Sequence, residues 1–230
     1  MWQDRRMPEE PLSAADLAAL SIFPLPEATL FPGALLPLHV FEPRYRALVT
    51  DALAGSRTLA VARLKPGFES DYGGRPPVFD VCGAGRIVEH TALPDGRFNV
   101  MLLGIARVRV VRELPAAQAY RVVRAELVRD LGFDPRLSAG LEQEVVSLWR
   151  TLGPRLPEAL RDLSEVTRGA AGAGEFADRI AALLAGDPDA SQALIAEPDP
   201  CERLRLIVER LRAAVVALGV SAPAAKMSLN

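Results

Sequence analysis

Few side chains in this sequence could support nucleophilic or acid–base chemistry. The only histidines are His39 and His90, and the only lysines are Lys65 and Lys226. A serine–lysine dyad needs a desolvated lysine beside its nucleophile. Lys65 lies among Gly and Pro residues and Lys226 lies close to the end of the chain, so we expect both to be solvated. Neither histidine is accompanied by a G-x-S-x-G motif, and we therefore expect no catalytic residue.

Motifs for phosphate and metal binding are also missing from the sequence. There is no GxxxxGK[ST] motif, and the Gly-Ala-Gly at 83–85 lacks the third glycine of a dinucleotide fingerprint, which favours a kink in a barrel strand. Cys82 and Cys201 are far apart and form no CxxC pair. Glu69 and Asp71 are too few for a calcium site. We expect no cofactor, no metal and two reduced thiols, with Cys82 in the core.

Two polar features near residue 40 are interpreted as structural. Alternation along 36–41 places His39 opposite Leu38 and Val40, which predicts a partly exposed or hydrogen-bonded histidine. Glu42 precedes a proline at the start of a predicted helix, where an acidic residue is favourable, and Arg44 follows it. We expect an internal ion pair there.

The charge balance argues against nucleic acid as the main partner. The formal net charge is −2 and the pI is about 5.8, whereas nucleic-acid binders are usually basic. Arg107 and Arg109 are predicted to share one strand face, and Arg86 and Arg97 lie on the neighbouring hairpin. These four residues could form a small basic face. The favoured interpretation is a solvated outer barrel face whose charge is balanced by nearby acidic residues.

Nothing in the sequence predicts export or a membrane span. The first eleven residues lead into no apolar signal region. The longest apolar runs, 100–106 and 213–220, are much shorter than the ~18 residues that a span requires. We expect a soluble, cytoplasmic protein.

The pattern of the chain changes near residue 130. Before it, apolar runs alternate with turn signals and predict strands at 20–25, 35–41, 58–64, 78–88, 86–92, 97–103, 107–112 and 120–128, with a helix at 43–54. Asp95-Gly96 between two apolar runs is a strong hairpin signal, and Gly104 is expected to break the run after it. Closing several short strands into a barrel removes exposed edges, so 1–130 is predicted to form a small barrel.

After residue 130 the spacing is helical. Three Asp-Pro pairs, at 134–135, 187–188 and 199–200, each place an N-cap before an N1 proline, and Glu202 is positioned for a capping box with the last. Apolar residues recur at three- and four-residue intervals in 137–152, 176–184 and 204–218. Residues 131–230 are predicted to form a helical bundle.

One segment could bind a partner. The polar loop at 65–77 carries Phe68 and Tyr72 among Gly, Ser and Asp residues, and aromatics on an adaptable loop make effective contacts. The alternative is that both rings fold back over the end of the barrel.

Several motifs resemble a known family, the amino-terminal (LON substrate-binding) domain of Lon proteases. The similarity is carried by residues 23–33, 36–45, 83–87, 93–98, 103–107, 197–200 and 203–204. It implies an α+β fold, a PUA-like β pseudo-barrel followed by an all-α helical bundle. It also implies that Pro32-Gly33 and 42–45 are fold determinants, and that the family region helps to recognise unfolded or tagged protein substrates.

These observations together predict a non-catalytic, stand-alone protein- or peptide-binding module, without Walker A motif or protease dyad, that could act as an adaptor in protein quality control. Phe68, Tyr72, Arg107 and Arg109 are the candidate binding residues. The alternatives are an RNA-binding PUA-like module and a sensor that binds a small ligand in a groove between barrel and bundle.

Overall fold

The computed structural model describes residues 12–219, except 116 and 185. Lys226 and the first eleven residues, both subjects of sequence-based predictions, therefore lie outside the described part. The chain forms two compact units. The first contains the residues up to Arg129 together with Ala181–Ala196, and the second contains Asp130–Ile180 and the chain from Glu197 onward.

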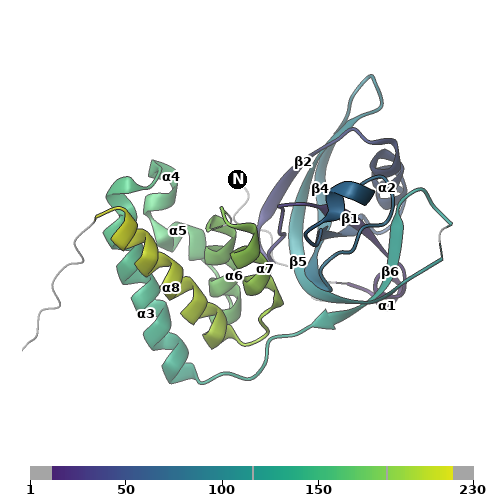
Figure 1. Cartoon of the computed structure of the whole chain (residues 1–230). Helices are drawn as coiled ribbons and strands as arrows, with labels where there is room; N and C mark the ends of the chain where they lie inside the picture. The colour runs from purple at the N-terminus through teal and green to yellow at the C-terminus, as the bar shows by residue number, and fades with distance from the viewer. Residues whose placement is uncertain (1–11, 116, 185, 220–230) are drawn as a thin grey trace, which may run out of the picture. The chain divides into compact units, whose positions relative to one another are not determined.

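The first unit is built on a six-stranded sheet that closes on itself. Its strands are β1 (Leu20–Leu25), β2 (Leu35–Val40), β3 (Thr58–Arg63), β4 (Val81–Ala92), β5 (Phe98–Glu113) and β6 (Arg121–Val128). Their order is β2-β5-β4-β3-β1-β6, and an additional β5–β6 pairing closes the ring (Figure 1). Only β1 and β3 run parallel. The fold is α+β, as predicted, with β2 attached to the outside of the closed ring through β5.

The long β4–β5 hairpin supplies most of the barrel wall. Gly96 adopts φ 78°, as the predicted Asp-Gly turn requires. The β4–β5 ladder shifts register between Ala84 and Gly85, where the extra, unpaired residue is Ile105 of β5; the extra residue on β4 is Val88, and a kink at the Gly-Ala-Gly sequence itself stays a prediction. The prediction that Gly104 ends the run is wrong, because β5 continues through it to Glu113, with the bulge residue Ile105 directly after it.

Gly104 is required for a different reason, which is the close approach of another backbone segment. A Cβ on Gly104 would lie 2.0 Å from the carbonyl oxygen of Phe31, and one on Gly83 would lie 1.7 Å from that of Leu30. The amide of Gly33 donates to the Gly104 carbonyl at 2.9 Å, and the Gly104 amide donates to Ala34 at 2.8 Å. The segment before β2 therefore crosses the hairpin in direct backbone contact.

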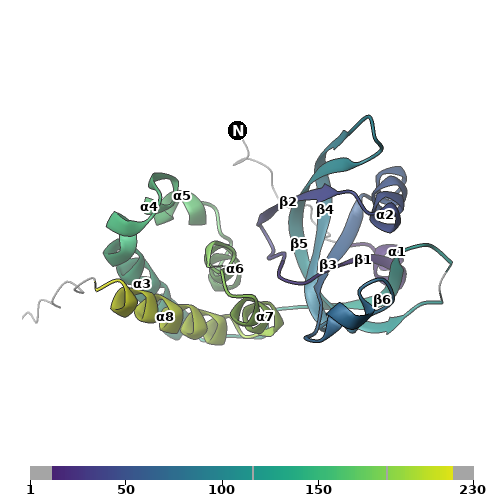
Figure 2. The same ribbon diagram turned by 45° about the horizontal axis from the view of Figure 1, so that its top comes forward.

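Helix α2 (Pro43–Ala54) covers one side of the sheet (Figure 2). It begins at Pro43 and ends before Gly55, as predicted. All six residues of β3 are buried, and their side chains alternate between two hydrophobic clusters. Ala60 and Ala62 pack with Cys82, whereas Leu59 and Val61 pack with the α2 side chains. Burial raises the pKa of Cys82 to about 12, consistent with its predicted place in the core.

Two further helices belong to the first unit. α1 (Ala14–Ala18) is closed by a Ser13–Asp16 capping box. α7 (Pro188–Ala196) comes from the second half of the sequence and packs against β4. The Gln192 side chain donates to the Val81 carbonyl at 3.0 Å, and Arg63 forms a 2.7 Å ion pair with Asp189.

The second unit consists of helices and begins with five residues of coil, 130–134. Its elements are α3 (Pro135–Leu152), η2 (Gly153–Arg155), α4 (Glu158–Arg161), α5 (Leu163–Thr167), most of α6 (Ala173–Leu183) and α8 (Pro200–Ala217). All three predicted Asp-Pro caps form; Asp134, Asp187 and Asp199 each accept backbone amide hydrogens. The predicted capping box at Glu202 does not form, because the Asp199 amide donates to Glu197 instead, and the Glu202 carboxylate pairs with Arg205.

A buried arginine joins three segments of the second unit. The Arg203 side chain is 0% exposed and donates to both carboxylate oxygens of Asp130, at 2.8 and 2.9 Å. Its Nε lies 3.4 Å from the buried carboxylate of Asp178 on α6, and its Nη1 donates to the Glu197 carbonyl. α3 and α8 pack side by side in both views (Figures 1 and 2). No helix within residues 12–219 is long and apolar enough to cross a membrane.

Replacement of Gly104 by alanine should destabilise the first unit. The new methyl group would collide with the Phe31 carbonyl, which is fixed by the crossing. We expect a loss of at least about 2 kcal/mol in the free energy of unfolding, measured with urea. Gly73→Ala is the control, because a Cβ there meets nothing within 4 Å. Equal stability of the two variants would contradict the crossing.

Asp178→Ala should destabilise the second unit, because it leaves a buried guanidinium with one carboxylate fewer. Loss of one partner in a buried ion cluster costs about 3–5 kcal/mol. Arg212→Gln is the control; Arg212 pairs with Glu144 on the surface, where such pairs contribute only about 0–1 kcal/mol. A small effect of Asp178→Ala in urea unfolding would show that the cluster is dispensable.

Candidate functional site

An apolar surface lies on the outer side of β2. Leu35, Pro37 and His39 alternate with the inward-facing residues of β2, and Phe41 follows the strand. Leu35 is 43% exposed and Phe41 is 58% exposed. Met101 is opposite Pro37 on β5 and extends the same face. We call these five residues the β2 surface.

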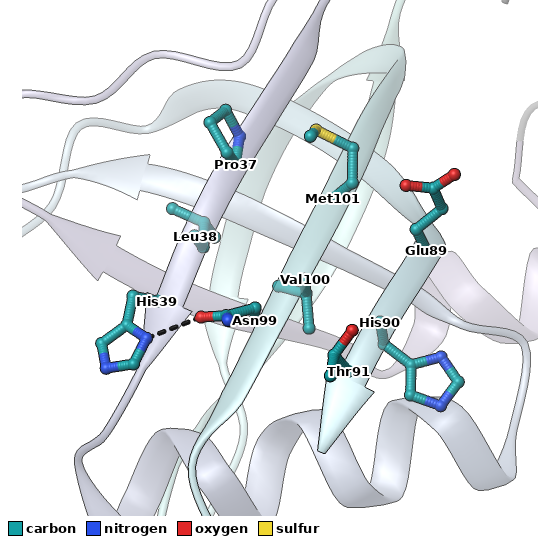
Figure 3. A pocket seen from close by; sticks show the side chains of 9 residues that line it. All are labelled: Pro37, Leu38, His39, Glu89, His90, Thr91, Asn99, Val100 and Met101. Atoms are coloured by element: carbon teal, nitrogen blue, oxygen red, sulfur yellow. Dashed lines mark hydrogen bonds between the residues drawn. The ribbon is translucent and has the colours of Figure 1, made fainter. Parts of the chain in front are cut away.

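The β2 surface borders an open depression of about 390 Å³ across β2, β5 and β4. Figure 3 shows the side chains that line it, from Pro37 and His39 on one side to Glu89 and Thr91 on the other. Asn99 lies in the middle. The lining is thus a mixture of apolar and hydrogen-bonding groups on a rigid sheet, a composition suited to binding.

His39 has hydrogen-bond partners on this surface. Its Nδ1 lies 2.7 Å from the Asn99 side-chain oxygen (Figure 3), and its Nε2 lies 3.4 Å from Nη1 of Arg97. This confirms the prediction of an exposed, hydrogen-bonded histidine. His90 also lines the depression, but it lies on β4, two strands away, and neighbouring strands are about 4.8 Å apart. The two histidines therefore lie on different strands of the depression.

The loop at 65–77 is held against α2 by polar contacts. Arg44 forms a 3.0 Å ion pair with Glu42, as predicted, and also donates to the Tyr72 carbonyl. The Tyr72 hydroxyl donates to Glu42 at 2.9 Å, and the Arg44 guanidinium lies over the Tyr72 ring. Phe68 packs against the barrel core, and Tyr72 is 36% exposed. The loop is therefore an ordered part of the barrel, and a binding role for Phe68 and Tyr72 stays a prediction.

The solvated outer face predicted for Arg107 and Arg109 is only partly present in the structure. Arg109 is exposed, but Arg107 on the same strand is only 5% exposed. Arg107 is paired in register with Gly83 on β4, the strand against which α7 packs. Alternation could not reveal that this side chain is buried, because its burial depends on contacts between residues distant in the sequence. A binding role for either arginine stays a prediction.

The other predicted site residues are dispersed. Lys65 is partly exposed, and its Nζ lies 3.8 Å from Asp80. Glu69 and Asp71 lie on the exposed 3-10 turn η1 (Phe68–Asp71). Cys82 and Cys201 are both buried and free. Within residues 12–219 the structure brings together no group of three potential metal ligands.

Comparison with known proteins identifies the family. Residues 19–213 match the family described as the ATP-dependent protease La (LON) substrate-binding domain. This match covers most of the chain. The chain belongs to this family.

The relatives of this LON domain are longer proteins. A Lon protease from Roseiflexus castenholzii is 31% identical over 197 residues, which cover 84% of this chain and 24% of that protein. Lon protease 2 from Myxococcus xanthus is 29% identical over 201 residues, covering 84% and 23%. The chain thus spans about a quarter of the length of the curated relatives that it matches.

Two solved structures share the fold. A Lon N-terminal domain protein from Xanthomonas campestris is 26% identical and aligns with a TM-score of 0.55 over 85% of this chain and 97% of that one. The N-terminal domain of a Mycobacterium avium complex Lon protease, at 19% identity, aligns with a TM-score of 0.65 over 84% and 98%. The second likeness concerns the fold alone.

Two of the motifs that suggested the LON family have a visible structural role. Gly33 adopts φ 78° and anchors the crossing segment to Gly104. Glu42 is the residue before α2 and holds both Arg44 and Tyr72. The sequence pattern does not indicate the β2 surface, because Leu35 and Phe41 resemble ordinary core residues. The edge position of β2 is known only from the strand order.

Arg44→Gln should loosen the loop without unfolding the barrel. The substitution removes the ion pair to Glu42 and the cation–π contact with Tyr72. Losses of this kind correspond to about a ten-fold faster amide hydrogen exchange in residues 65–77. Arg109→Gln, which removes the same charge from an exposed position, should leave that exchange unchanged. Unchanged exchange in Arg44→Gln would contradict the anchoring.

Proposed function

We propose that this chain is a non-catalytic protein-binding module that holds an extended apolar segment of an unfolded polypeptide on the β2 surface. The observation that carries the proposal is an exposed row of apolar side chains on an edge strand. Membership of the LON substrate-binding family supports protein as the class of partner.

The edge of β2 has backbone groups that a partner chain could use. β2 pairs with β5 alone among the described strands. Pro37 lies opposite Met101 of β5 and has no amide hydrogen to donate. Its place in the strand therefore fits a position whose backbone nitrogen points away from β5, toward the open edge. By alternation, Leu35 and His39 then turn their amides and carbonyls toward the open edge. An extended segment could pair with these groups, while Pro37 prevents a continuous ladder of the kind that promotes aggregation.

The side chains favour an apolar occupant over a charged one. Leu35, Pro37, Phe41 and Met101 supply hydrocarbon surface, and His39 and Asn99 satisfy each other by hydrogen bonding. Arg97 is neutralised by Asp95 at 2.5 Å. Burial of apolar surface is then the main source of binding free energy, and the affinity should depend little on salt.

The proposal is tested with Leu35→Ser/Phe41→Ser and a fluorescent, permanently unfolded polypeptide such as reduced carboxymethylated α-lactalbumin. We expect the double variant to bind at least about ten-fold more weakly in fluorescence anisotropy, because binding partly buries these two large side chains. Both residues are exposed in the free protein, so the variant should fold normally.

The matched control is Val111→Ser/Leu137→Ser, which removes two exposed apolar side chains elsewhere. It should bind like the wild type. Failure of the wild-type protein to bind the unfolded polypeptide would refute the function, and equal losses in both double variants would refute the location. Binding of RNA that falls steeply with salt would favour the nucleic-acid alternative instead.

A further inference from the structure

A second, smaller cavity lies at the end of the barrel beside α2. It has a volume of about 180 Å³ and is lined by Arg44, Tyr45, Gly73, Gly74, Arg75, Ala119, Tyr120 and Arg121. All of its charged lining residues are arginines. We call it the Tyr45 pocket; it has no lining residue in common with the depression beside the β2 surface.

The arginines of the Tyr45 pocket are positioned from outside by carboxylates. Glu113 pairs with Arg75 at 2.5 Å and with Arg121 at 2.9 Å. Arg121 also donates to the Pro76 carbonyl at 2.7 Å, which fixes the loop over the pocket. Arg44 is held by Glu42 at 3.0 Å, and neither Glu42 nor Glu113 lines the cavity. Three guanidinium groups are therefore already held around a small space in the free protein. A ligand would bind them with little further loss of side-chain entropy.

Tyr45 provides an independent indication of a ligand. Its side chain is only 4% exposed, yet no group in the described part of the chain forms a hydrogen bond with its hydroxyl. The hydroxyl oxygen is not among the atoms sealed from solvent, and Tyr45 lines both this cavity and an adjoining crevice. The hydroxyl therefore reaches the cavity with its hydrogen-bonding capacity unused by the protein, and it can donate to an acceptor bound there.

The Tyr45 hydroxyl is available as a donor over the ordinary pH range. Burial raises its pKa to about 12, although nearby Arg44 acts in the opposite direction. The neighbouring Tyr120 hydroxyl is already used, because it donates to Asp51 at 2.7 Å. Tyr45 is therefore the tyrosine of this pocket whose hydrogen-bonding capacity remains free for a ligand.

We propose that the Tyr45 pocket binds a single oxyanion group, a carboxylate or a phosphate, which accepts a hydrogen bond from Tyr45 and charge-assisted hydrogen bonds from Arg44 and Arg75. Guanidinium groups suit both anions, because their paired N–H donors match two oxygens at once. The small volume restricts the bound part to the anionic group and a few attached atoms.

The experiment uses the whole chain and Tyr45→Phe, which removes the hydroxyl and keeps the ring. Isothermal titration with inorganic phosphate and with acetate is carried out at constant ionic strength, with sodium chloride as the reference salt. We expect at least one anion to bind the wild type and to bind Tyr45→Phe about ten-fold more weakly or worse, because a charge-assisted hydrogen bond is lost.

The source of the anion is resolved by peptides. A tripeptide with a free carboxyl terminus is compared with its amide; binding of the free acid alone assigns the pocket to a peptide end, and binding of phosphate alone assigns it to a phosphorylated ligand. Either result supports the oxyanion site. Binding of amide and free acid with equal affinity, none of it lost in Tyr45→Phe, would overturn it.

Stability measurements separate binding from folding. Without ligand, Tyr45→Phe should have the melting temperature of the wild type, because the hydroxyl has no hydrogen bond within the described chain to lose. Arg97→Gln serves as the control for non-specific attraction of anions, because it removes a positive charge outside the pocket, where Arg97 pairs with Asp95 on the hairpin; its anion affinity should equal that of the wild type. If no anion binds the wild type, or Tyr45→Phe binds as tightly, the proposal is wrong.

Discussion

The architecture of the barrel depends on one close backbone crossing. The segment before β2 passes over the β4–β5 hairpin at a distance that only glycine permits, since a Cβ at Gly83 or Gly104 would overlap the carbonyl oxygens of Leu30 and Phe31. The crossing sends the chain to the outside of the closed ring, where β2 can pair only with β5. The exposed edge, and with it the β2 surface, is a direct consequence of that path.

The two proposed sites differ in their chemistry. The β2 surface is mainly apolar, and its His39 is hydrogen-bonded to Asn99, so the proposed partner would bind there by burial of apolar surface. The Tyr45 pocket has the opposite character, with arginines held by glutamates and a hydroxyl that has no partner in the described chain. An apolar segment and an anionic group could therefore be recognised by different parts of the molecule without competition.

Buried charge has different roles in the two units. In the second unit, Arg203 joins α8 to Asp130 and Asp178, which are far apart in the sequence. An ion cluster of this kind specifies one arrangement of segments, because any alternative leaves a charge unpaired away from water. In the first unit Arg107 is buried beneath neighbouring structure, and this removes it from the surface on which a basic face was expected.

The sequence by itself determined the local elements: the Asp-Gly hairpin, the helix from Pro43 and the three Asp-Pro caps depend on backbone preferences of neighbouring residues. It also determined the family, through motifs that fix turns and helix starts. Only the tertiary structure decided that Gly104 permits a crossing, that α7 joins the first unit, and that Tyr45 lines a pocket of arginines. These depend on contacts between residues distant in the chain, which periodicity cannot encode.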